Sequence, residues 1–145
     1  MHRLCEILLC VDSCKSAAFF SPDEMITVLI IDDDEHMRKA CSRVLSAQGW
    51  SVLCAETGDE GLTLLKNCER KIDVILLDNL MPGLSGTDVL VQAKTLDPAV
   101  RIIMITGCVT EEYSAEITSM GASGCLPKPF TPAQLRHALD QSGAD

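Results

Sequence analysis

Short apolar runs alternate with amphipathic helical stripes five times between residues 26 and about 142 of this 145-residue chain. The runs are bounded by turn residues and are too short for helices, which is typical of strands buried on both faces. Strict strand–helix alternation with short connections indicates a parallel sheet covered by helices on both sides. We therefore expect one doubly wound α/β domain, whose ligands would bind at the carboxyl ends of the strands.

The expected elements follow directly from these patterns. The apolar runs cover residues 26–31, 51–55, 72–77, 101–105 and 124–127. After each run, apolar residues recur three and four positions apart, as on the buried face of an amphipathic helix. In the third helix the expected stripe consists of Val89, Leu90, Ala93 and Leu96. The pattern does not give the order in which the strands lie side by side.

Capping residues mark the helix starts independently of the apolar stripes. Thr57 with Glu60, and Thr131 with Gln134, have the spacing of capping boxes, in which two side chains satisfy free backbone N–H groups. Thr110 is a further expected N-cap, and the two glutamates that follow it are favoured there by the helix dipole.

The composition narrows the classes of function. A formal net charge of −9 argues against direct binding of nucleic acid, and an aromatic content of 3% argues against a base-stacking surface. No apolar run approaches the roughly eighteen residues that span a membrane. The eight cysteines form no C-x-x-C pair, and several fall at apolar positions, where cysteine acts as a small hydrophobe. This usage indicates a reducing, cytoplasmic setting.

Residues 1–24 differ from the rest of the chain. They have no lasting periodicity, and Glu6 and Asp12 interrupt the apolar core that a secretory signal would need. We interpret residues 1–24 as an N-terminal extension that is disordered or not native, and residues 25–145 as the domain.

Polar side chains stand at the carboxyl ends of four expected strands, which meet at one edge of a parallel sheet. They are Asp32 and Asp33, Asp78, Thr106 and Lys128. Three carboxylates in one pocket repel one another, and a bound cation would relieve the repulsion. Oxygen ligands favour Mg²⁺ or Mn²⁺ over zinc. A carboxylate beside a cation, with an ammonium and a hydroxyl opposite, is equipped to attack a phosphoryl group.

Nucleotide- and flavin-binding versions of such a fold are not indicated. They need a loop rich in glycine or hydroxyl groups after the first strand, whose backbone N–H groups bind phosphate. Residues 32–35 are all acidic instead, and the chain contains no G-x-x-x-x-G-K-[ST] sequence.

Residues 25–142 resemble the receiver domain of two-component response regulators, in its stand-alone, chemotaxis-type form. Four motifs carry this resemblance, each in the expected order and spacing. They are residues 30–35 with Arg38, residues 78–86, residues 103–107 and residues 126–130. The resemblance implies the flavodoxin-like strand order 2-1-3-4-5. It also implies a signalling phosphoacceptor rather than an enzyme acting on other molecules.

The resemblance assigns roles to the acidic residues. Asp78 would accept a phosphoryl group from a sensor histidine kinase or a histidine phosphotransfer protein. Asp32, Asp33 and Asp78, together with the backbone carbonyl of Leu80, would hold Mg²⁺ or Mn²⁺ in the site.

The remaining motif residues would carry the response. Lys128 would pair with the phosphoryl group, Thr106 would hydrogen-bond it and draw its loop inward, and the Lys128–Pro129 bond would be cis. A downstream protein would bind the surface of the fourth helix, last strand and fifth helix, and phosphorylation could also drive homodimer formation. The family usually has an aromatic residue three positions before the lysine. Here that position is Cys125, so the aromatic coupling is weakened or replaced.

Two other classes of function stay open. A phosphorylation-independent adaptor is made plausible by Cys125. A Mg²⁺-dependent aspartyl-phosphate hydrolase would usually carry a second aspartate two residues after the nucleophile, where this chain has Leu80. In the family, the positions of Leu80 and Cys108 neighbour the water that removes the phosphoryl group. Because the apolar Leu80 cannot orient a water, we predict a long-lived phosphoryl group.

Overall fold

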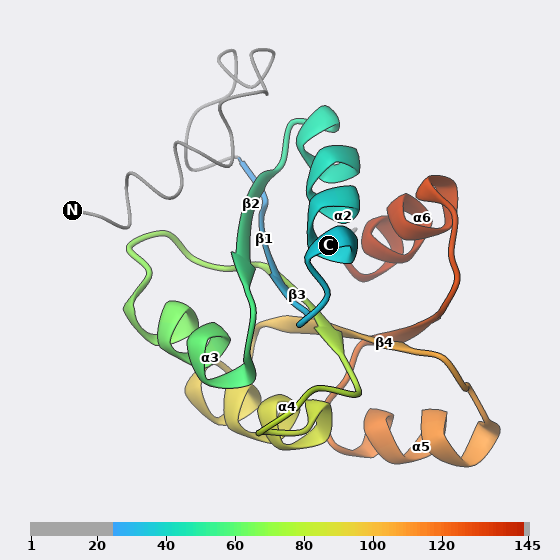
Figure 1. Ribbon diagram of the computed structural model, residues 1–145. Helices are drawn as coiled ribbons and strands as arrows, with labels where there is room; N and C mark the ends of the chain where they lie inside the picture. The colour runs from blue at the N-terminus through green and yellow to red at the C-terminus, as the bar shows by residue number, and fades with distance from the viewer. Residues whose placement is uncertain (1–24, 144–145) are drawn as a thin grey trace.

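The structure is a computed structural model that describes residues 25–143, so the extension expected at residues 1–24 lies outside the described part of the chain. Its centre is a single parallel sheet of five strands (Figure 1). The strands are β1 (Thr27–Ile31), β2 (Ser51–Ala55), β3 (Val74–Asp78), β4 (Arg101–Thr106) and β5 (Gly124–Pro127). Their order is β2-β1-β3-β4-β5, which confirms both the fold class and the expected order 2-1-3-4-5.

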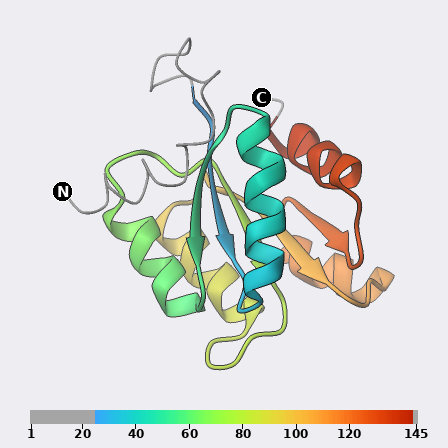
Figure 2. The same ribbon diagram turned by 45° about the horizontal axis from the view of Figure 1, so that its top comes forward.

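Five helices cover the two faces of the sheet (Figure 2). They are α2 (Glu35–Ala47), α3 (Gly58–Asn67), α4 (Gly86–Leu96), α5 (Glu111–Ser119) and α6 (Pro132–Gly143). Side chains of α2 and α6 pack into one apolar cluster, and those of α3, α4 and α5 pack into the other. Within the described part of the chain, no helix combines the length and the apolar character needed to cross a membrane.

The apolar strands are explained by this double covering. All five residues of β1 are buried, and its side chains alternate between the two clusters. Leu29 and Ile31 point toward α3 and α4, whereas Val28 and Ile30 point toward α2 and α6. Each such side chain contributes about 1.5–3 kcal/mol when it is fully buried. A polar residue on either face of β1 would forfeit this contribution.

The capping predictions are confirmed, with one difference in detail. Thr131 Oγ1 accepts the Gln134 N–H group at 3.1 Å, and Gln134 Oε1 accepts the Thr131 N–H group at 2.8 Å. Thr57 Oγ1 accepts the Glu60 N–H group at 3.1 Å, but Glu60 Oε1 accepts the N–H group of Glu56 instead of that of Thr57. Both side chains still satisfy backbone donors at the start of α3.

The expected bounds of three strands and the expected burial of one side chain differ from the structure. β1 begins at Thr27 rather than at residue 26, and β4 ends at Thr106 rather than at residue 105. The third strand runs from Val74 to Asp78 instead of covering residues 72–77, although Ile72 is buried just before it. Leu96 was expected on the buried stripe of α4, but its side chain is 47% exposed. Leu96 is the last residue of α4, and it lines an open groove between α3 and α4.

Candidate functional site

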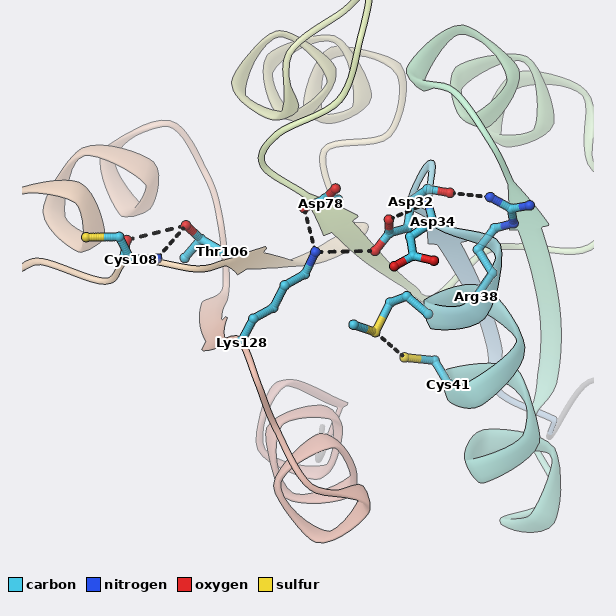
Figure 3. A network of polar contacts seen from close by, with 9 residues as sticks. Asp32, Asp34, Arg38, Cys41, Asp78, Thr106, Cys108 and Lys128 are labelled. Atoms are coloured by element: carbon cyan, nitrogen blue, oxygen red, sulfur yellow. Dashed lines mark hydrogen bonds and ion pairs between the residues drawn. The ribbon is translucent and has the colours of Figure 1, made fainter.

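The carboxyl edge of the sheet brings the expected residues into one region (Figure 3). Asp32 directly follows β1, Asp78 is the last residue of β3, and Thr106 is the last residue of β4. Lys128 follows β5 at once. Because β1 and β3 are neighbours in the sheet, Asp32 and Asp78 leave it side by side.

Three carboxylates form an acidic cluster at this edge. Oxygen atoms of Asp32, Asp33 and Asp78 lie within 4.8 Å of one another. Asp32 is fully buried and Asp78 is 4% exposed, whereas Asp33 faces solvent. The cluster thus has two buried members and one that faces solvent.

Asp32 accepts hydrogen bonds through both its side chain and its backbone. Its Oδ1 atom accepts the N–H group of Asp34 at 2.9 Å, and its backbone carbonyl accepts Arg38 Nη1 at 2.7 Å. Asp34 in turn caps α2 by accepting the His36 N–H group at 2.9 Å. Arg38 belongs to the first sequence motif, but its contact with the Asp32 carbonyl was not foreseen. The only sequence signal for it is its place one helical turn after the acidic run.

Burial and like charges raise the pKa of Asp32 to about 6 from its ordinary value of 3.8. Loss of hydration is the largest cause, and the neighbouring charges of Asp78 and Asp33 add to it. The Asp34 N–H group and the Lys128 ammonium act in the opposite direction. Ionising this carboxyl therefore costs free energy when no cation is bound.

Lys128 links the two buried carboxylates. Its Nζ atom lies 3.3 Å from Asp78 Oδ1 and 3.8 Å from Asp32 Oδ2. The Lys128 backbone N–H group donates to the Thr106 carbonyl at 2.8 Å, which ties the end of β5 to the end of β4. The Lys128–Pro129 bond is cis, as the resemblance implied.

Thr106 does not point into the acidic cluster in this structure (Figure 3). Its hydroxyl donates to the Cys108 carbonyl and accepts the Cys108 N–H group, each at 3.3 Å. Thr106 therefore lies at the same edge of the sheet as the acidic cluster, but its hydroxyl is hydrogen-bonded within its own loop. Leu80 lies two residues after Asp78 with its side chain 77% exposed, and the role of its backbone carbonyl stays a prediction.

The acidic cluster fits a hard cation. Asp32 Oδ2 is buried and accepts no hydrogen bond from the described residues, although a buried carboxylate oxygen normally has a partner. The three carboxylates supply oxygen ligands only, the kind that Mg²⁺ and Mn²⁺ prefer.

Comparison with known proteins identifies the family. The model of the response regulator receiver domain matches residues 28–140, and the chain therefore belongs to this family. Its members are receiver domains of two-component systems, which are signalling modules rather than ordinary enzymes. The motifs at the strand ends had implied the same family, so this prediction is confirmed.

Relatives and solved structures agree with this membership. The chain is 33% identical to response regulator MprA of Mycobacterium sp. (strain KMS) over 110 residues, which is 76% of this chain and 47% of MprA. The chain spans about half or less of the curated relatives that it matches.

Among solved structures, chemotaxis protein CheY4 of Vibrio cholerae is 30% identical with a TM-score of 0.76, covering 81% of this chain and 98% of CheY4. The CheX-CheY-BeF3-Mg+2 complex from Borrelia burgdorferi is 26% identical with a TM-score of 0.77, covering 80% and 87%. Both likenesses extend over nearly all of the described domain.

Proposed function

We propose that Asp78 is the phosphoacceptor of this receiver domain. The observation that carries the proposal is the 3.3 Å contact between Lys128 Nζ and Asp78 Oδ1 beside the other two carboxylates. An oxygen nucleophile with an ammonium on one side and a cation-binding cluster on the other is suited to phosphoryl transfer. Thr106 supplies a hydroxyl donor at the end of β4, the strand that pairs with β3.

Asp32, Asp33, Asp78 and the carbonyl of Leu80 would hold Mg²⁺ or Mn²⁺. When bound, the ion neutralises negative charge on the transferred oxygens. Two observations support this assignment: Asp32 Oδ2 accepts no hydrogen bond from the described residues, and the three carboxylates are grouped. A magnesium ion and a beryllofluoride group are both named for the similar structure from Borrelia burgdorferi, which also supports it.

The proposed reaction moves one phosphoryl group. A carboxylate oxygen of Asp78 forms a bond to phosphorus as the P–N bond to a donor histidine breaks, and the bonding electrons return to the imidazole nitrogen. Lys128 balances charge on the phosphoryl oxygens throughout. The donor would be a sensor histidine kinase or a histidine phosphotransfer protein. Several cysteines pack in the apolar clusters as small hydrophobes, which supports the proposed reducing, cytoplasmic setting.

The response would spread from Thr106 to the surface of α5, β5 and α6. Thr106 would leave Cys108 and bind the phosphoryl group, and the β4–α5 loop would follow it. A groove of about 360 Å³ lies on this surface, lined by residues of β5 and α6 that include Cys125, Leu126 and His137. This groove supports the proposal that a downstream protein, or a second copy of the chain, binds there.

The proposal is tested by the mass of the intact protein after incubation with acetyl phosphate and Mg²⁺. Wild-type protein should gain one phosphoryl group, and Asp78→Asn should gain none. Asp59→Asn is the matched control, because Asp59 is an exposed aspartate in the first turn of α3. No gain in folded wild-type protein would instead favour the adaptor. Rapid consumption of the donor without an adduct would favour the hydrolase.

A further inference from the structure

Tyr113 is the one tyrosine of the chain, and its hydroxyl group is buried without a hydrogen-bond partner among the described residues. It lies in the first turn of α5, where its backbone N–H group donates to the N-cap Thr110 at 3.0 Å. The ring packs against the apolar cluster between α5 and the sheet. Buried tyrosine hydroxyls normally have a partner, so this one calls for an explanation.

The surroundings of Tyr113 connect it to the candidate site. Cys125 packs against the same cluster, and it pairs with Met104 across β4 and β5. Thr106 stands two residues beyond Met104 and so points to the same face of the sheet. Burial raises the pKa of Tyr113 to about 12, and the nearby groups Cys125, Glu116 and Asp78 add to the effect. Tyr113 therefore packs against the face of the sheet that carries Cys125 and, by the alternation of side chains along β4, Thr106.

The hydrogen bonds of Thr106 supply a partner for this hydroxyl. A threonine hydroxyl has one proton, and here Thr106 donates it to the carbonyl of Cys108. If Thr106 turns to donate to a phosphoryl oxygen on Asp78, that carbonyl loses its donor. Cys108 lies three positions before the first residue of α5, in the loop that leads to Tyr113.

We propose that Tyr113 couples phosphorylation of Asp78 to α5. When Thr106 no longer donates to the Cys108 carbonyl, the Tyr113 hydroxyl donates to that carbonyl instead, and the Tyr113 ring moves with the loop. In this proposal, the aromatic residue that links phosphorylation to the helix is Tyr113 on α5. The usual aromatic position on β5 is occupied by Cys125, which has no ring. This inference rests on the proposed function, because it requires a phosphoryl group on Asp78.

Fluorine NMR tests the inference directly, because protein labelled with 3-fluorotyrosine carries a single fluorine, at Tyr113. Spectra are recorded at neutral pH before and after acetyl phosphate and Mg²⁺, with the intact mass measured on the same sample. We expect the resonance to shift when the phosphoryl group is gained. The Thr106→Ala variant should gain the phosphoryl group, but its fluorine resonance should not shift. If the wild-type protein gains the phosphoryl group and its fluorine resonance does not shift, the role of Tyr113 is contradicted but the proposed function is not. Absence of the phosphoryl group would overturn the proposed function as well.

A second variant isolates the hydroxyl from the ring. Tyr113→Phe keeps the ring, so the domain should fold and gain the phosphoryl group like the wild type. The backbone amide shifts that phosphorylation causes across α5 should be largely lost in Tyr113→Phe. Ile117→Val is the control for altered packing, because Ile117 is buried on the same helix and has no hydroxyl. Amide shifts in Tyr113→Phe equal to those of the wild type would contradict the proposal.

Discussion

Lys128 Nζ lies 3.3 Å from Asp78 Oδ1 and bridges, at 3.8 Å, to Asp32 Oδ2. Both aspartates are almost fully buried, so this ammonium compensates two carboxylates that water reaches poorly. The same contact places a positive charge where a phosphoryl group on Asp78 would carry its negative oxygens. Lys128 thereby compensates the charge of both carboxylates before phosphorylation and, in our proposal, the charge of the phosphoryl group on Asp78 afterwards.

Replacing Lys128 with alanine should slow phosphorylation of Asp78. Removal of one preorganised donor from a site of developing charge typically costs about a hundredfold in rate or more. The rate of phosphoryl gain from acetyl phosphate, followed by intact mass, measures this effect. Lys66→Ala is the control, since Lys66 is an exposed lysine in the last turn of α3. Equal rates in wild type and Lys128→Ala would contradict the role given to this ammonium.

Metal-free protein should lose stability as the pH rises from about 4 to about 6. The pKa of Asp32 is raised to about 6 in the folded state from 3.8, so the folded state binds this proton more tightly than the unfolded state. The resulting stabilisation is complete below the unfolded pKa and is lost as the pH passes the folded one. The loss is on the order of 3 kcal/mol.

Urea unfolding in EDTA measures this pH dependence. Asp32→Asn has no carboxyl to titrate at this position, so its stability should fall less over the same pH range. Added Mg²⁺ at neutral pH should stabilise the wild type more than Asp32→Asn, because ion binding favours the folded state. The interpretation fails if both proteins show the same pH dependence.

The phosphoryl group should be long-lived because Leu80 cannot orient a hydrolytic water. Its side chain is 77% exposed beside the site, so a polar replacement could reach the attacking water without repacking the core. Leu80→Gln should shorten the lifetime by about tenfold or more, as expected for a positioned polar group. Leu96→Gln is the control, since Leu96 is an exposed leucine at the far end of α4. Wild-type half-lives of minutes or less in Mg²⁺, without a phosphatase, would contradict this prediction.

Gly86 should be required for the position of the loop that follows Asp78. A Cβ atom at Gly86 would lie 2.7 Å from both the Asp78 carbonyl oxygen and the Asn79 Cα atom, and these backbone atoms cannot move cheaply. Gly86→Ala should cost about 1–3 kcal/mol of stability, as overpacking does, and should slow phosphorylation. For stability, Gly107→Ala is the control, because nothing lies within 4 Å of its added Cβ. Urea unfolding compares the two variants.

Local signals in the sequence predicted most of the fold. The last strand, residues 124–127, and the capping pair Thr131 and Gln134 match the structure, because turn residues and helix caps depend on neighbours in the chain. The exposure of Leu96 could not be predicted, because helical periodicity does not say whether another element covers a given position.

In the candidate site, too, the features set by the sheet could be predicted from the sequence, whereas the features set by loop conformation and packing could not. The closeness of Asp78 and Lys128 was predictable, because parallel strands bring their carboxyl ends to one edge. The hydrogen bonds of Thr106 to its own loop, and of Arg38 to the Asp32 carbonyl, depend on loop conformation and rotamers. The unpartnered hydroxyl of Tyr113 depends on how α5 packs on β4 and β5, which no local pattern specifies.

The central claim, that Asp78 is the phosphoacceptor, is tested most directly by locating the modified residue. Protein phosphorylated with acetyl phosphate and Mg²⁺ is reduced with borohydride, which converts an aspartyl phosphate to homoserine, and its peptides are sequenced by mass spectrometry. We predict homoserine at position 78 and unchanged aspartate at Asp32 and Asp33. Homoserine at another position, or unchanged aspartate at position 78 in protein that has gained a phosphoryl group, would contradict the account.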